Sequence, residues 1–174
     1  MNTLVVGLDL GKANDPSAMA VLRNLTCVDL TRFPIRIPYP QVVKYVSYVI
    51  KNIGAVLALD GTGVGKAVAD MFIEEGIVPI SVTITGGKVA TGGKEPYEIN
   101  VPKPILLDVL RKVMQQGFLK VPQGLTFSAE LREELDLFTR EGYSIVTKRK
   151  FGSHGDLVFA LALAAYVTVY KGEK

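Results

Sequence analysis

The first third of the chain decides the fold, and it reads TLVVGLDL (residues 3–10), SAMAVLR (17–23) and LTCVDLTRF (25–33). Each stretch is short, rich in strand-forming residues such as Leu and Val, and bounded by a turn or a polar loop. A parallel pair of strands would need a crossover of a dozen or more residues between its members. The short connections therefore predict three strands that pair antiparallel with their neighbours.

The middle of the chain alternates between helix and strand patterns. Apolar residues recur at helical spacing over 41–52 and about 64–75, and the apolar runs 55–59 and 77–84 are typical of buried strands. This alternation predicts parallel strands joined by helices. The rest of the chain predicts helices over 105–116, 128–140 and 157–170, a strand over 143–150, and a long Gly- and Pro-rich loop over 85–104.

The composition excludes several classes of protein. The 174 residues carry 20 Lys and Arg against 17 Asp and Glu, and 48% of them are hydrophobic, as in ordinary globular domains. A single cysteine (Cys27) and a single histidine (His154) exclude an internal disulfide, a thiolate zinc cluster and a multi-histidine metal site. We expect no signal peptide, because no basic region precedes the first apolar run, and no membrane span, because the longest apolar stretch has only 14 residues (157–170). We expect one soluble, cytoplasmic domain over residues 1–174.

Three aspartates occupy positions where ligand sites of α/β proteins lie. Asp9 and Asp60 each end an apolar strand, and Asp156 starts the last predicted helix. Each residue alone fits a structural role as a helix or turn cap. Together they offer the oxygen ligands that a hard divalent cation requires.

Other polar residues flank this set. Asp15 follows the first strand and is either a fourth ligand or the start of an Asp-Pro turn, and His154 is either an auxiliary site residue or a surface residue near a helix start. Basic residues in the flanking segments would attract a phosphate backbone if they cluster in space, or would otherwise be ordinary solvated charges. These are Lys88, Lys94, Lys103, Lys148, Arg149 and Lys150.

The stretch DGTGVGKA (residues 60–67) is similar to a phosphate-binding P-loop but departs from it at two positions. The motif requires Gly first and Ser or Thr after the lysine, whereas this chain has Asp60 and Ala67. The glycines are better explained as a flexible turn behind Asp60, whose backbone amides could still meet a phosphate.

Three segments of the chain, VVGLDLG (5–11), ALDGTGVG (58–65) and HGDLVFALALA (154–164), resemble the acidic motifs of the nuclease domain of phage large terminases. The order and spacing of the motifs match over nearly the whole chain. The resemblance implies an RNase H-like α/β fold, with a mixed five-stranded sheet of three antiparallel strands followed by parallel strands and flanked by helices. It also implies that the first and fourth strands are adjacent, so that Asp9 lies beside Asp60.

The same resemblance implies a metal-dependent endodeoxyribonuclease that cuts concatemeric viral DNA during genome packaging. Asp9, Asp60 and Asp156, with Asp15 as an auxiliary, would hold two Mg²⁺ or Mn²⁺ ions for phosphodiester hydrolysis. Double-stranded DNA would be the substrate, and residues 85–104 would form a flap or hairpin over it. In a packaging motor the partners would be a terminase ATPase domain, the small terminase subunit and the portal, in the host cytoplasm.

The chain departs from that family in two respects. Many relatives have two acidic residues in the last motif, whereas here Gly155 precedes Asp156, and no segment resembles the ATPase motor, so we expect an excised domain or a free-standing relative. Three alternatives stay open. They are a RuvC-like Holliday-junction resolvase, a phosphotransferase of the actin and Hsp70 superfamily, and a non-catalytic nucleic-acid-binding module.

Overall fold

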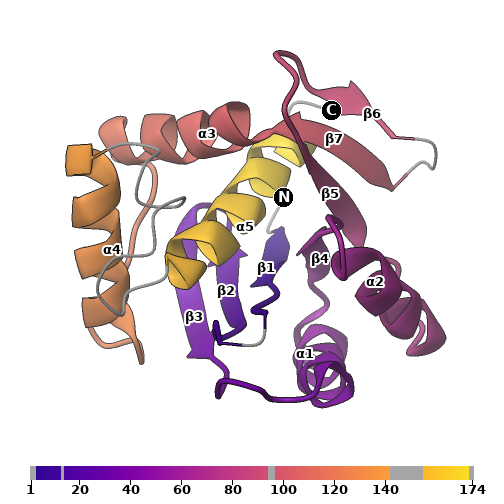
Figure 1. Cartoon of the computed structure of the whole chain (residues 1–174). Coiled ribbons are helices and arrows are strands. Elements are labelled where there is room, and N and C mark those ends of the chain that lie inside the picture. The colour runs from indigo at the N-terminus through magenta and orange to yellow at the C-terminus, as the bar shows by residue number, and fades with distance from the viewer. Residues whose placement is uncertain (1–2, 13, 94–96, 142–154, 173–174) are drawn as a thin grey trace.

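The computed structural model describes residues 3–12, 14–93, 97–141 and 155–172, and its centre is a seven-stranded mixed sheet (Figure 1). The strands follow the order β3-β2-β1-β4-β5-β7-β6. β1 pairs antiparallel with β2, and β2 with β3. β1, β4, β5 and β7 run parallel to one another, and β6 pairs antiparallel with β7. The strands are β1 (Leu4–Asp9), β2 (Ala18–Arg23), β3 (Thr26–Arg32), β4 (Val56–Asp60), β5 (Ile80–Thr85), β6 (Thr91–Gly92) and β7 (Glu98–Pro102).

Five helices cover the two faces of the sheet. α1 (Tyr39–Ile53) and α2 (Gly65–Glu74) pack on one face around Phe72. α3 (Lys103–Gln115), α4 (Ser128–Glu141) and α5 (Asp156–Gly172) pack on the other. The alternation of strand side chains separates the two cores, so that Val5 faces α5 while Val6 faces α1 and α2.

The structure confirms the predicted fold class and corrects one segment. The stretch 85–104, predicted as a loop, contains β6 and β7, and β7 pairs with β5 over five residues. These two strands raise the sheet from the expected five strands to seven. The sequence suggested a loop because Gly92, Gly93 and Pro102 are typical of turns. The signal for β7 is the alternation of Ile99 and Val101, which face the core, with polar residues. The strand predicted over 143–150 lies outside the described residues.

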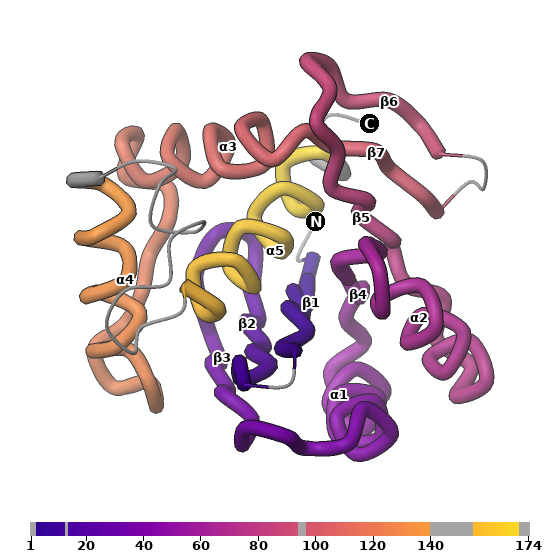
Figure 2. The backbone as a smooth tube through the Cα atoms, viewed as in Figure 1, coloured from indigo at the N-terminus to yellow at the C-terminus, as the bar shows by residue number. Residues whose placement is uncertain are grey.

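α5 is the central helix of the structure, and it runs directly across β1 and β2 (Figure 2). Its residues 157–165 are all buried, because the sheet, α3 and α4 surround it. This explains a helix that is apolar on all sides. None of the helices in the described residues is both long and apolar enough to cross a membrane.

The contact between α5 and β1 is made through backbone. A Cβ added at Gly7 would lie 2.0 Å from the carbonyl oxygen of Ala160 and 2.8 Å from the amide nitrogen of Ala164. Only glycine therefore allows the helix to lie this close to the strand. The close approach also fixes the position of the N-terminus of α5 relative to the carboxyl end of β1.

We expect Gly7→Ala to lower the free energy of unfolding by about 1–3 kcal/mol, the usual cost of overpacking a core. Urea denaturation measures this loss. Gly86→Ala is the matched control, because a Cβ at Gly86 would meet no atom within 4 Å. Equal stability of the two variants would show that α5 does not rest on the backbone of β1.

Candidate metal centre

Asp9 and Asp60 lie side by side at the carboxyl ends of β1 and β4. The two strands pair in parallel with Leu8 opposite Leu59, so the next residue on each strand is an aspartate. Leu8 and Leu59 pack toward α1 and α2. Because successive side chains of a strand alternate between faces, Asp9 and Asp60 point to the face that α5 covers.

Asp156 comes to the same place from the first turn of α5. It is 3% exposed, and its Oδ2 accepts a hydrogen bond of 2.8 Å from Nε of Arg32. Its Oδ1 is buried and has no hydrogen-bond partner among the residues that the structure describes. A buried carboxylate oxygen without a donor or a cation is costly. This oxygen therefore indicates a place where a cation would be favourable.

The three aspartates are close enough for their negative charges to affect one another. Burial raises the pKa of the Asp9 carboxyl well above its usual range, and the negative charges of Asp60 and Asp156 raise it further. The ammonium of Lys103 opposes this rise, while Asp15 adds to it. The site thus concentrates more negative charge than its own basic residues neutralise.

Two lysines lie within electrostatic range of these carboxylates. Burial raises the pKa of Asp60, against which act the hydrogen bonds from Thr62 and the charges of Lys12 and Lys103. Burial lowers the pKa of Lys103, and the charges of Asp9 and Asp60 oppose that change. Lys103 is the first residue of α3, and its Nζ lies 5.6 Å from the centre of the Phe159 ring.

The three aspartates are neighbours, yet they do not converge on one point. Across the described ranges, no three acidic, histidine or cysteine side chains lie close enough to hold a metal ion together. Like charges repel one another, and Arg32 draws Asp156 to itself. A shared cation would require these side chains to turn toward each other.

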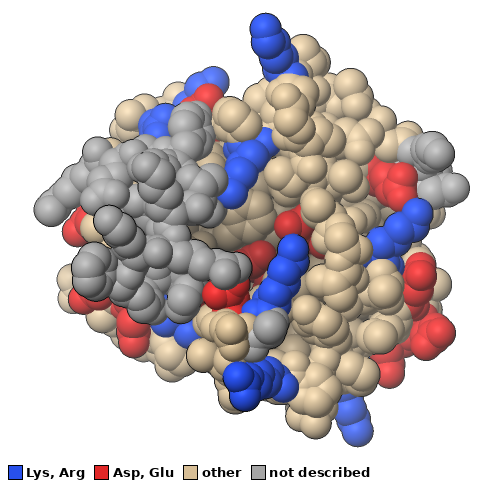
Figure 3. Space-filling model, in the orientation of Figure 1, with Lys and Arg blue, Asp and Glu red and all other residues tan. Residues whose placement is uncertain are grey.

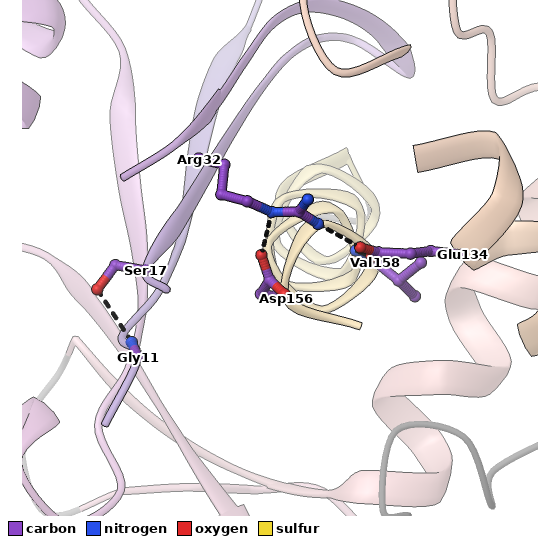
Figure 4. A network of polar contacts seen from close by, with 6 residues as sticks. All are labelled: Gly11, Ser17, Arg32, Glu134, Asp156 and Val158. Carbon is purple, nitrogen blue, oxygen red and sulfur yellow. Dashed lines mark hydrogen bonds and ion pairs between the residues drawn. The ribbon is translucent and has the colours of Figure 1, made fainter. Parts of the chain in front are cut away.

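Arg32 joins Asp156 to a second buried acid, Glu134 of α4 (Figure 4). Glu134 is 2% exposed, and burial together with the charge of Asp156 raises its pKa to about 7, although Arg32 and the Val158 amide act in the opposite sense. No pattern in the sequence predicts this pair. Arg32 ends a strand and Glu134 lies within an acidic helix, and neither belongs to a motif.

The remaining predicted residues fall into two groups. Asp15 follows β1 and lies close enough to raise the pKa of Asp9, and Lys88 is exposed between β5 and β6. Acidic side chains lie in a hollow of one face of the molecule, with Lys and Arg side chains on either side (Figure 3). The other candidates lie outside the described residues: Lys94, Lys148, Arg149, Lys150 and His154.

The turn after Asp60 supports the rejection of a P-loop. The amide of Gly61 donates to the Val82 carbonyl over 3.0 Å, and the amide of Thr62 donates to Oδ1 of Asp60 over 2.9 Å. The amide of Gly65 donates to the carbonyl of Thr62 over 3.2 Å. A phosphate cradle needs free amides, and these three already have partners within the protein.

Comparison with known proteins identifies the fold. No family model and no curated protein matches the sequence. Among solved structures, the large terminase nuclease of thermophilic phage G20c with bound magnesium is 23% identical, with a TM-score of 0.69 over 94% of this chain and 80% of that chain. A mutant nuclease domain of the large terminase subunit gp2 of bacterial virus Sf6, with manganese and beta-thujaplicinol, is 14% identical, with a TM-score of 0.68 over 94% of this chain and 87% of that chain.

A viral protein of a eukaryotic host gives the same result. The manganese-soaked, inhibitor-bound terminase nuclease domain of human cytomegalovirus is 16% identical, with a TM-score of 0.61 over 95% of this chain and 82% of that chain. These matches agree with the resemblance that the acidic motifs suggest. The chain has the RNase H-like fold of the nuclease domains of terminase large subunits.

Proposed function

We propose that this protein is a divalent-metal-dependent DNA endonuclease of the terminase large-subunit type, which cuts concatemeric viral DNA during packaging. The observation that supports this most directly is the placement of Asp9, Asp60 and Asp156 at one edge of the sheet. The same fold carries magnesium, cobalt or zinc in the phage G20c nuclease and manganese in the Sf6 and cytomegalovirus domains. DNA is therefore the substrate that we propose for this chain.

The donor set fits hard divalent cations. Asp9, Asp60 and Asp156 would hold the ions through their carboxylate oxygens, with Asp15 as an auxiliary ligand, because the charges of the other three aspartates all act on Asp9. Oδ1 of Asp156 has no hydrogen-bond partner in the described part of the chain, so it offers one more oxygen ligand for a cation. When bound, a pair of Mg²⁺ or Mn²⁺ ions supplies an activated water and stabilises charge on the leaving 3′ oxygen.

The basic residues of the chain would hold the DNA backbone near these carboxylates. Lys103 and Lys12 lie within range of Asp60 and would attract the phosphate that enters the site. We propose further phosphate contacts for Lys88, Lys94 and the 148–150 cluster, and an auxiliary role for His154, on the basis of the sequence. In a packaging motor, the ATPase domain, small subunit and portal are the partners that we propose.

The decisive experiment is cleavage of supercoiled plasmid with Mn²⁺, Mg²⁺ or EDTA. We expect nicking or linearisation with either ion and none with EDTA. Asp60→Asn should lower the rate by more than about 100-fold, the upper end of the loss caused by removing an outer partner of a metal ligand. Asp70→Asn is the control, because Asp70 is exposed on α2 and its change alters the charge equally.

Three outcomes would contradict the proposal. Equal cleavage by Asp60→Asn and wild type would remove Asp60 from the site. A strong preference for four-way junctions over linear duplex would favour a resolvase instead. Retention of DNA without cleavage, in a folded protein that binds no metal, would favour a non-catalytic binding module.

The raised pKa of Asp9 leads to a prediction about stability and pH without metal. The folded state binds this proton more tightly than the unfolded state, so the stabilising contribution is complete below about pH 4, the ordinary aspartate value, and is lost as the pH rises through the folded pKa. Asp9→Asn should therefore be more stable than wild type at about pH 8 in EDTA. Urea denaturation at several pH values should show this advantage shrinking toward about pH 4. An advantage independent of pH would show that it does not come from the charge on Asp9.

Metal should reverse that order of stabilities. An ion that binds only the folded state raises the free energy of unfolding by about 2.7 kcal/mol at 100 times its dissociation constant. We expect Mn²⁺ to raise the melting temperature of wild type and of Asp70→Asn equally, and that of Asp9→Asn much less. A thermal shift that is the same in all three proteins would place the ion elsewhere.

A further inference from the structure

Arg32 is a single cation held between two buried carboxylates (Figure 4). Its Nε donates to Oδ2 of Asp156 over 2.8 Å, and a terminal nitrogen donates to Oε1 of Glu134. The guanidinium also lies over the Phe127 ring, 5.8 Å from its centre. It is thus oriented from three directions, by α5, by α4 and by the segment that precedes α4.

Glu134 is fixed in turn by the backbone of α5. Its Oε2 accepts a hydrogen bond of 3.1 Å from the amide of Val158, in the first turn of the helix that Asp156 begins. Each oxygen of Glu134 therefore has its own partner. The side chain cannot leave Arg32 without also exposing an unpaired amide at the helix start.

The charges of this group do not cancel. One guanidinium faces two carboxylates, so Glu134 takes up part of the positive charge that would otherwise neutralise Asp156. If Glu134 were uncharged, Arg32 and Asp156 would form a neutral pair at low dielectric. Asp156 would then attract a second cation more weakly through its free Oδ1.

We propose that Glu134 is a positioning residue that shares Arg32 with Asp156, so that the three side chains together keep a net negative charge toward a divalent cation. This inference rests on the proposed function, because it assumes that Asp156 is a metal ligand. Glu134 itself touches neither DNA nor metal in this assignment. It acts through Arg32, which orients Oδ2 of Asp156 and leaves Oδ1 for the ion.

The alternative is that the ion pairs of Arg32 only hold β3, α4 and α5 together. In that case the loss of Glu134 lowers the free energy of unfolding, but it does not change how strongly the folded protein attracts a cation. Metal affinity measured without substrate therefore separates the two roles. The conservative change Glu134→Gln keeps the shape of the side chain and a carbonyl oxygen that can accept the Val158 amide.

The test is a calorimetric titration of the whole chain with Mn²⁺ at about pH 8, above the pKa of Glu134. We expect Glu134→Gln to bind Mn²⁺ at least about tenfold more weakly than wild type, within the range known for outer partners of metal ligands. Glu133→Gln is the matched control, since Glu133 is the preceding, exposed residue of α4 and its change removes the same charge. Equal affinity of Glu134→Gln and Glu133→Gln would overturn the proposal.

A double variant makes the cause of the effect testable. Arg32→Gln combined with Glu134→Gln removes both charges and leaves Asp156 fully negative, so Mn²⁺ affinity should return to the wild-type value or exceed it. A double variant as weak as Glu134→Gln, or weaker, would overturn the electrostatic role. If Glu134→Gln does not fold, Arg32→Gln takes its place: it leaves both acids without their shared cation, so it should bind Mn²⁺ more tightly than wild type, and equal or weaker binding would overturn the proposal. A wild-type protein that binds no Mn²⁺ would instead overturn the proposed function itself.

Discussion

The packing of α5 across β1 and β2, with the backbone of β1 exposed to it at Gly7, is the contact on which the rest of the structure depends. Gly7 removes the side chain that would separate the helix from the strand, and Ala160 and Ala164 present only small groups to it. α5 therefore packs close to the sheet, and α3 and α4 pack against α5. The same contact fixes the start of α5 beside the carboxyl ends of β1 and β4. The hydrophobic core thus sets the separation between Asp156 and the two strand-end aspartates.

The site concentrates like charges that destabilise the fold, and its surroundings only partly compensate. The negative charges of Asp60 and Asp156 act on Asp9, while Lys12, Lys103 and Arg32 supply opposing positive charge. Arg32 forms ion pairs with both Glu134 and Asp156, so its single positive charge does not neutralise both. This arrangement is consistent with the metal site that we propose, because carboxylates that repel one another attract a multivalent cation.

Much of the fold could be predicted from sequence because its signals are local. The strands that end in Asp9 and Asp60 are short apolar runs, and their parallel pairing follows from the helices that separate them. β7 escaped prediction because Gly93 and Pro102 suggest a loop, and only pairing with β5 makes the segment a strand. The link between Arg32 and Glu134 spans 102 residues and carries no motif. Such a contact depends on how α4 docks, which no local pattern encodes.

The two edges of the sheet have a consequence for how the protein behaves at high concentration. Open edges offer unpaired amides and carbonyls to other chains and so promote aggregation. One edge here is β6, which is only two residues long. At the other edge, the segment after α3 lies along the start of β3, where the amide of Cys27 donates to the Lys120 carbonyl over 2.8 Å and the amide of Lys120 donates to the Leu25 carbonyl over 2.9 Å. A two-residue edge strand and cover over the start of β3 both disfavour strand addition by a second molecule.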